Sequence, residues 1–201
     1  MTFHILRHAE KEVGEFYNPR LRHQDPPISE QGQRSAEKLY PYFAEKQIAA
    51  IYVSGYQRTW QTIEYTARKL GLEPIHDERL NEVDNGLVEG LGEDKLKLKY
   101  PEVWQGFRDR NHDFRFPEGE TGEEACNRIA GFLEEKRQQH GNDSLIVVCH
   151  DGLTRLMMCH LMGIPVYQRW NFQVDFCGIT EITYQPKHAT WKLIHFNHTC
   201  P

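Results

Sequence analysis

Three groups of basic and imidazole side chains in this sequence could together bind a phosphoryl group. Arg7 and His8 follow the apolar run FHIL, Arg58 follows AAIYVSG, and His150 follows SLIVVC. Arginine presents a planar fork of N–H donors that matches two phosphate oxygens, and cations also offset the charge that develops in phosphoryl transfer. These residue types therefore predict a site for a dianionic phosphoryl group.

Position, and not the Arg-His pair itself, carries this prediction. The pair occurs again as Arg22-His23, in an irregular stretch where we expect it to face solvent. His8 and His150 are far apart in the chain, but the carboxyl ends of parallel strands meet at one edge of a sheet. Helix N-termini that follow such strands add free N–H donors for an anion. If the three apolar runs are parallel neighbours, the basic side chains converge.

Each residue also has a structural interpretation. His150 alone could be a buried histidine with its hydrogen bonds satisfied, and Arg58 alone could be a solvated arginine in the first turn of a helix. Histidines also bind metals, but the chain has no HExxH motif and no ligand-like spacing beside these histidines. We therefore predict no metal site and no cofactor.

The elements that must position these residues alternate between strand and helix. Short apolar strands are predicted at 3–6, 49–55 and 144–149. Helices are predicted at 29–43 with a kink at Pro41, at 121–140 and at 151–162, and another helix has Arg58 in its first turn and ends at Gly71. GITEITY and TWKLIHF predict a hairpin with its turn at 185–189. This order predicts a three-layer α/β/α sandwich with a mainly parallel sheet and a C-terminal antiparallel hairpin. Residues 9–28 are expected to form an irregular loop, and 93–118 an inserted cap segment.

Composition limits the classes of protein that fit. The 201 residues predict a single domain, and a net charge of −5 argues against a broad nucleic-acid surface. Five cysteines without a CxxC spacing predict reduced thiols. The sequence shows no signal peptide and no apolar run long enough to span a membrane, so we expect a cytoplasmic protein without membrane partners. The oligomeric state is not predicted.

Six segments resemble motifs of the histidine phosphatase superfamily, the phosphoglycerate-mutase-like proteins. LRHAE resembles its Arg-His-Gly motif, DPPISEQGQRSAEKL its helix entry, and YVSGYQRTWQT its Ser-Pro-x-x-Arg segment. RLNEVDNGLVEG, FPEGET and VVCHDGLTR resemble three further motifs, in the family's order along the chain. The C-terminal hairpin lies outside these matches.

The resemblance implies a role for each matching residue. His8 would be the nucleophile that becomes a phosphohistidine, with its other ring nitrogen held by an acceptor such as a backbone carbonyl. Arg7, Arg58 and His150 would hold the phosphoryl oxygens, and Glu82 would be the acid that protonates the leaving oxygen. Other acids could replace Glu82 or support it; the alternatives are Glu10 and Glu89, and Glu120 is expected to be a supporting residue.

The sequence also departs from the family pattern. Ala9 stands where the family has Gly, so this position should not need a positive φ. Gly55 replaces a Pro, and Asp151 replaces a Gly and is expected to point away from the phosphate and cap the following helix. The family's early Asn has no counterpart at its usual spacing.

The predicted activity is hydrolysis of phosphomonoesters of a small phosphorylated metabolite, with inorganic phosphate as product. Three alternatives remain open: a phosphoglycerate mutase, a phosphoprotein phosphatase, and a non-catalytic phosphate-binding module on the same fold. The 9–28 loop could supply substrate contacts from Asn18, Arg20 and Arg22, and either arginine could hold a second anionic group. The aromatics Trp104, Phe107, Phe114 and Phe116 are candidates to cover the site.

Overall fold

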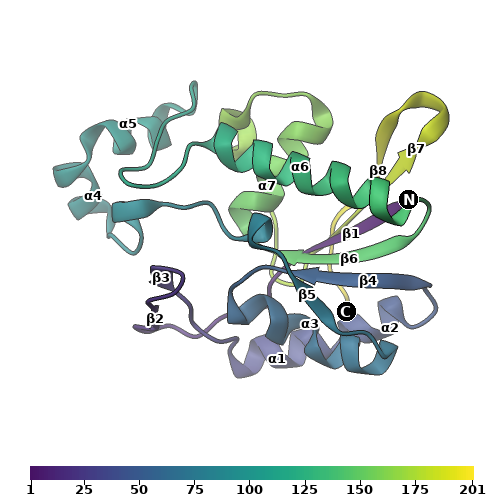
Figure 1. Cartoon of the computed structure of the whole chain (residues 1–201). Helices are drawn as coiled ribbons and strands as arrows, with labels where there is room; N and C mark the ends of the chain where they lie inside the picture. The colour runs from purple at the N-terminus through teal and green to yellow at the C-terminus, as the bar shows by residue number, and fades with distance from the viewer.

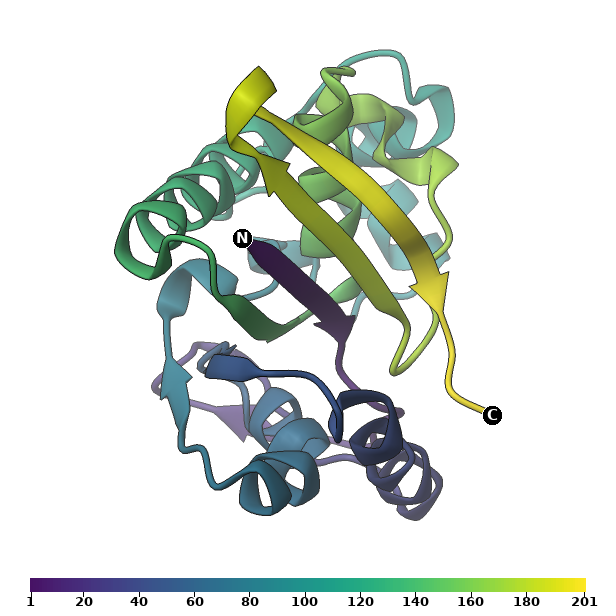
Figure 2. The ribbon, with the colours of Figure 1, turned by 90° about the vertical axis from the view of Figure 1, so that its right-hand side faces the viewer.

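The computed structural model describes all residues, 1–201, and is built around one six-stranded sheet. The strand order is β5-β4-β6-β1-β7-β8. β1 (Thr2–Arg7), β4 (Ile48–Val53), β5 (Pro74–His76) and β6 (Ser144–Cys149) are parallel, whereas β7 (Ile179–Gln185) and β8 (Thr190–His198) form an antiparallel hairpin beside β1. The predicted fold class is therefore confirmed, hairpin included (Figures 1 and 2).

Helices cover both faces of the sheet. One face carries α1 (Glu30–Glu37), α2 (Leu39–Phe43) and α3 (Gln57–Leu70), and the other carries α6 (Gly122–His140) and α7 (Asp151–Met162), as Figure 1 shows. Two clusters of fully or nearly buried apolar residues fill the interfaces. The central strands β1 and β6 contribute to both clusters, which explains their continuous hydrophobicity.

Local signals set the ends of most helices. The Ser29 hydroxyl accepts from the Gly32 N–H at the start of α1, and Thr121 and Glu124 form the predicted capping box of α6. Gly71 and Gly163 adopt left-handed φ values of 69° and 64° and end α3 and α7. The predicted helix from Ser29 breaks between Glu37 and Leu39, just before Pro41.

Two segments project from the sheet at the carboxyl ends of its parallel strands. The loop after β1 contains the hairpin of β2 (Tyr17–Asn18) and β3 (His23–Gln24), and α4 (Glu93–Lys99) and α5 (Pro101–Asp109) lie opposite it (Figure 1). The remaining elements are short 3-10 helices at 78–80, 86–88, 166–171 and 186–188. β2, β3 and the 166–171 turn were not predicted. No helix is long and apolar enough to cross a membrane.

Candidate active site

The structure brings the ends of β1 and β6 and the start of α3 together, as the sequence predicts. The rings of His8 and His150 lie 5.2 Å apart between centroids, and Arg58 Nη2 lies 3.1 Å from His150 Nδ1. His8, His150 and Arg58 are 4%, 0% and 6% exposed. The ends of β1 and β6 and the start of α3 therefore meet at one site. The turn after β5 also reaches this site through Glu82.

His8 is held in one tautomer by its neighbour. Its Nδ1 lies 2.7 Å from the carbonyl oxygen of Ala9. Because a carbonyl oxygen only accepts, Nδ1 carries the proton and Nε2 keeps a free lone pair. Burial, followed by the charge of Arg58, lowers the pKa of His8 well below its ordinary value, so the ring is neutral at pH 7. A neutral imidazole with a free Nε2 is a nucleophile.

Ala9 fits this backbone without strain. It is not among the residues with positive φ, and its side chain is fully buried against the cluster around α1–α3. Its N–H donates to Thr62 Oγ1 at 2.8 Å, and that hydroxyl donates to the Arg58 carbonyl at 2.7 Å. The expectation that this position needs no glycine is confirmed, and the same bonds tie the His8 segment to the first turn of α3.

The two arginines have buried N–H groups that make no hydrogen bond within the protein. These are Nε of Arg7 and both Nε and Nη1 of Arg58, the last of which lies 3.7 Å from Asp25 Oδ1. Arg7 donates to the Val174 carbonyl and stacks at 4.0 Å on the ring of Phe176, while Arg58 stacks at 4.2 Å on Tyr56. Buried donors in proteins are nearly always satisfied, so a group with acceptor oxygens fits here.

His150 is fixed by two partners. Arg58 donates to Nδ1, so the proton of the neutral ring is on Nε2, which donates to Ser54 Oγ at 2.8 Å. Burial and the charge of Arg58 lower the pKa of His150 well below its ordinary value. In this state His150 orients Arg58, and both of its ring nitrogens already have partners.

Glu82 reaches the same volume from the turn after β5. Its Oε1 accepts from the N–H groups of Val83 and Leu153 at 2.9 and 3.1 Å, and its Oε2 accepts from Gly152 at 3.3 Å. Burial is the largest influence on Glu82 and raises its pKa, although the backbone bonds and Arg58 oppose it. A carboxyl group that stays protonated more readily than usual can act as a general acid.

The other candidate acids have separate partners. Glu10 accepts from the Ser29 hydroxyl at 2.7 Å, and Glu89 lies 2.6 Å from His23 Nδ1, a bond that raises the pKa of His23. Glu120 pairs with Arg128 at 2.6 Å, and Arg128 donates to the Glu82 carbonyl at 3.1 Å. Glu120 therefore supports the backbone of Glu82, as the sequence suggested.

The prediction that Asp151 caps the helix after it is wrong. Asp151 is the first residue of α7 and pairs with Arg155 at 2.8 Å, while the free N–H groups of that helix donate to Glu82. Its charge also acts on Arg7 and Glu82. The sequence could not reveal this arrangement, because Glu82 reaches the helix from a distant turn.

The structure explains why glycine can replace the family's proline at position 55. The Gly55 N–H, which proline lacks, donates to Asn81 Oδ1 at 2.8 Å.

The predicted contacts of the 9–28 loop lie at the rim of the site. Asn18 Nδ2 donates to Asp25 at 3.0 Å, and Asp25 Oδ1 lies 3.7 Å from Arg58. Arg20 is 77% exposed and lies 3.9 Å from Glu78, and Arg22 lines a small cavity with Asp84 and Glu118. The sequence did not indicate Phe176 or Asp25, because neither lies in a periodic segment.

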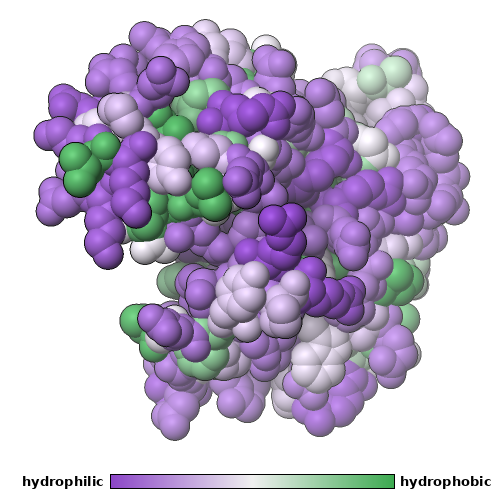
Figure 3. All heavy atoms as spheres, turned by 60° about the vertical axis from the view of Figure 1, so that its left-hand side comes forward, coloured by the Kyte–Doolittle hydropathy of each residue, from purple (hydrophilic) through white to green (hydrophobic).

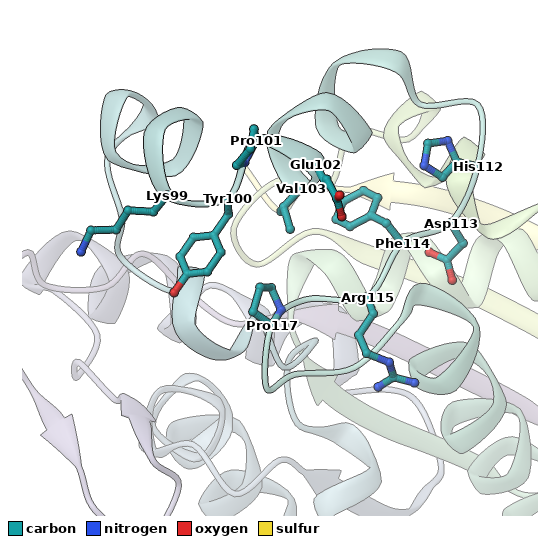
Figure 4. A pocket seen from close by; sticks show the side chains of 10 residues that line it. All are labelled: Lys99, Tyr100, Pro101, Glu102, Val103, His112, Asp113, Phe114, Arg115 and Pro117. Atoms are coloured by element: carbon teal, nitrogen blue, oxygen red, sulfur yellow. The ribbon is translucent and has the colours of Figure 1, made fainter.

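A separate cavity lies away from His8. It measures about 610 Å³ and is lined by residues of 99–103 and 112–117 (Figure 4). Two of its charged groups have structural partners: Asp113 accepts from the first N–H groups of α6 and pairs with Arg169, and Arg115 pairs with Glu124. Phe107, Phe114 and Phe116 pack on one another beside it. Its histidine and arginine, His112 and Arg115, are exposed, unlike the buried His8, Arg58 and His150.

A hollow lies between the two segments that project at the carboxyl ends of the parallel strands, the edge of the sheet at which β1 and β6 deliver His8 and His150. Figure 3 shows this hollow between the α4–α5 region and the lower part of the molecule, with hydrophobic side chains gathered on its upper lip. Leu98 and Leu87 are 82% and 49% exposed on one segment, and Val13 is 98% exposed on the other. No group of three or more His, Cys, Asp or Glu side chains is arranged to hold a metal ion.

Comparison with known proteins agrees with this geometry. A model of the histidine phosphatase superfamily (branch 1) matches residues 3–198. The chain belongs to this superfamily. It is 32% identical to phosphoserine phosphatase 1 of Hydrogenobacter thermophilus over 98% of this chain and 92% of that protein. It is 26% identical to a Shigella dysenteriae protein named "Probable phosphoglycerate mutase GpmB", over 92% of this chain and 86% of that one.

Solved structures of the superfamily share the fold. A mycobacterial glucosyl-3-phosphoglycerate phosphatase matches with a TM-score of 0.83 and 19% identity, over 98% of this chain and 99% of that one. The α-ribazole phosphatase of Shigella flexneri matches with a TM-score of 0.81 and 20% identity, over 98% and 96%. At these identities the likeness establishes the architecture, including the C-terminal hairpin.

Proposed function

We propose that this chain hydrolyses phosphomonoesters of a small phosphorylated metabolite, with His8 as the nucleophile. The observation that carries the proposal is the bond between His8 Nδ1 and the Ala9 carbonyl, which leaves Nε2 unprotonated beside the unpartnered donors of Arg7 and Arg58. A buried imidazole with one fixed tautomer, near two guanidinium groups that each keep N–H donors without a hydrogen bond, supports nucleophilic attack on a bound phosphoryl group.

The reaction has two steps in this site. His8 Nε2 attacks phosphorus, the bond from phosphorus to the ester oxygen breaks, and Glu82 gives its proton to the leaving oxygen. Water then attacks the phosphohistidine, Glu82 takes a proton from that water, and the bond between nitrogen and phosphorus breaks. Inorganic phosphate leaves and His8 returns to its neutral state, so protons balance over the cycle.

The arginines and His150 stabilise charge during both steps. Arg7 and Arg58 supply the donors described above, and the carbonyl of Val174 and the rings of Phe176 and Tyr56 hold their guanidinium planes. A proton gained by His150 on binding of the dianion would add a further donor. Preorganised donors of this kind are a large part of phosphoryl-transfer catalysis.

The names of the relatives support the substrate class. We infer that residues 93–118 act as a cap within a single domain of 201 residues. The relatives are named for phosphoserine, glucosyl-3-phosphoglycerate and α-ribazole phosphate, all small metabolites, and for phosphoglycerate interconversion. Hydrolysis of a small phosphomonoester is the activity that these observations favour.

Turnover of a phosphometabolite panel by the wild-type chain and His8→Ala tests the proposal. We expect release of inorganic phosphate by the wild type and a loss of about 10⁴-fold or more in His8→Ala. His188→Ala, an exposed histidine in the β7–β8 turn, is the matched control and should retain full activity. Unchanged turnover in His8→Ala would refute the nucleophile. Net interconversion of phosphoglycerates with a bisphosphate primer, without phosphate release, would identify a mutase instead.

A further inference from the structure

The second Arg-His pair of the sequence does not face solvent as a whole. Arg22 is exposed, but the side chain of His23 is only 14% exposed. His23 lies on β3, in the segment that projects after β1, and lines a cavity of about 370 Å³ whose wall also includes Tyr56 and Glu82. The proposed function gives this imidazole no role, although the same cavity contains the proposed acid.

Both ring nitrogens of His23 meet carboxylates of one turn. Nδ1 lies 2.6 Å from Glu89 Oε2, and Nε2 lies 3.3 Å from Asp84 Oδ1. A carboxylate only accepts hydrogen bonds, so the ring can donate to both of them only when it carries two protons. The hydrogen bond to Glu89 is the main reason that the pKa of His23 is raised, and it outweighs partial burial and the charge of Arg22.

Charges of both signs surround His23. Tyr56 packs against it with 6.5 Å between the ring centroids. The other charged groups that share its cavities are Arg22, Glu78, Glu82, Glu118, Glu120 and Arg128. Of all the carboxylates, only those of Asp84 and Glu89 lie within ion-pair distance of the ring. These two contacts therefore stabilise its charged form.

On its own side, His23 is anchored to the helix that carries Arg58. Two residues along, the Asp25 carboxylate accepts from the Gln57 N–H at 3.0 Å, and the Asp25 carbonyl accepts from the Gln57 side chain. Asp25 is 5% exposed, and its Oδ1 lies 3.7 Å from Arg58 Nη1. The β2–β3 hairpin is therefore fixed to the first turn of α3.

On the other side, the two carboxylates belong to the turn of the proposed acid. Asp84 and Glu89 follow Glu82 shortly in the chain. The Glu82 carboxyl group has no ion pair and accepts from backbone N–H groups, among them those of Gly152 and Leu153 at 3.3 and 3.1 Å. Whether these bonds form depends on where the turn places the carboxyl group.

We propose that His23 is a positioning residue for Glu82. Its imidazolium bridges Asp84 and Glu89 and so holds the turn of the acid at a fixed distance from Arg58 and a bound phosphoryl group. This rests on the proposed function and adds a regulation of that site, because a neutral ring can donate to only one of the two carboxylates. The bridge should therefore be complete at low pH and be lost as pH rises through the raised pKa of His23.

Dependence on the leaving group tests the inference, because only a substrate with a poor leaving group needs the acid. Below pH 6.5, where His23 is protonated, we expect His23→Gln to lower kcat for phosphoserine about 10-fold more than kcat for p-nitrophenyl phosphate. His23→Arg keeps a positive charge with two donors and should restore most of this ratio. His188→Gln, an exposed histidine in the β7–β8 turn, is the matched control and should leave the ratio unchanged.

The same ratio, measured against pH, separates the charge of His23 from its shape. Dividing the wild-type ratio by that of His23→Gln at each pH cancels the titration of Glu82, which both chains share. This quotient should fall towards 1 as pH rises, whereas the quotient of His23→Arg over His23→Gln should stay constant. A wild-type quotient that does not change with pH, or a ratio that His23→Gln leaves intact, would overturn the inference.

Hydrogen exchange reads the position of Glu82 without turnover. The Gly152 and Leu153 amides donate to Glu82, whereas the Thr154 amide of the same helix donates to a backbone carbonyl. His23→Gln should speed exchange of the first two amides about 10-fold relative to the third. Unchanged exchange, or equal acceleration of all three, would overturn the inference even if the chain hydrolyses phosphomonoesters. Absence of turnover in the wild type would overturn the proposed hydrolysis alone.

Discussion

The phosphate end of the site and its rim are built on different kinds of backbone. His8, Arg58 and His150 stand at strand ends or in the first turn of a helix, and all three are buried. Arg20 and Leu98, at the rim, lie in projecting segments and are mostly exposed. The sheet thus fixes the groups that we propose meet the phosphate. Exposed segments such as those at the rim vary more among related proteins than the elements they connect.

The largest effect is expected at Glu82, which lies on a turn and is only partly buried but reaches the phosphate end of the site. Glu82→Gln should lower kcat for phosphoserine by about 10²–10⁴-fold, because the serine alkoxide of this substrate is a poor leaving group unless it gains a proton. The loss should be much smaller for p-nitrophenyl phosphate, whose leaving group needs no proton. Steady-state kinetics with both substrates measure the difference, and equal losses would contradict the acid role.

The same variant gives a pH test. The first step needs Glu82 protonated, and burial raises its pKa above the ordinary carboxyl range. Activity on phosphoserine should therefore decline as pH rises through that raised pKa, and the decline should disappear in Glu82→Gln. His8 must be neutral, and its pKa is lowered, so its protonation should limit activity only well below pH 6.5. A wild-type profile that rises with pH over this range would refute the assignment.

The sequence predicted some features of the molecule well and others not at all. The strands that end at Arg7, Val53 and Cys149, and the caps at Ser29, Thr121 and Gly163, depend on local signals, so their positions and the convergence of the basic groups could be predicted. The partners of those groups could not. Glu82 meets the start of α7 and Phe176 meets Arg7 only after distant segments pack together.

An intermediate effect is expected at Asn197, which supports Arg7 at the phosphate end from the distant strand β8. It lies on β8 with φ 54°, accepts from the Asp175 N–H at 2.8 Å and donates to the Asp175 carboxylate at 2.8 Å. The loop it holds contains Val174 and Phe176, which fix Arg7. Asn197 is therefore a positioning residue for an arginine far away in the sequence.

Asn197→Gly tests this role, because glycine tolerates the left-handed φ and only the side-chain bonds are lost. Two such bonds contribute roughly 1–3 kcal/mol together, and we expect the inhibition constant of inorganic phosphate to rise about 10-fold. Ala189→Gly changes another residue of positive φ, 49°, in the distant β7–β8 turn and should leave that constant unchanged. A lower Tm without a change in phosphate inhibition would show that Asn197 serves stability alone.

The smallest effect is expected at Arg20, where the rim should matter least. Its ion pair with Glu78 spans 3.9 Å between side chains that are 77% and 80% exposed. Pairs of this kind contribute about 0–1 kcal/mol, so Arg20→Ala should change the free energy of unfolding by less than about 0.5 kcal/mol. Its kcat/KM for phosphoserine should stay within about 2-fold of the wild type, because the Arg20 side chain is mostly exposed and lies beside Glu78. A loss of about 10-fold that is confined to carboxylated substrates would place the 9–28 loop over the bound substrate. The boundary between the fixed phosphate end and the variable rim would then lie beyond Arg20.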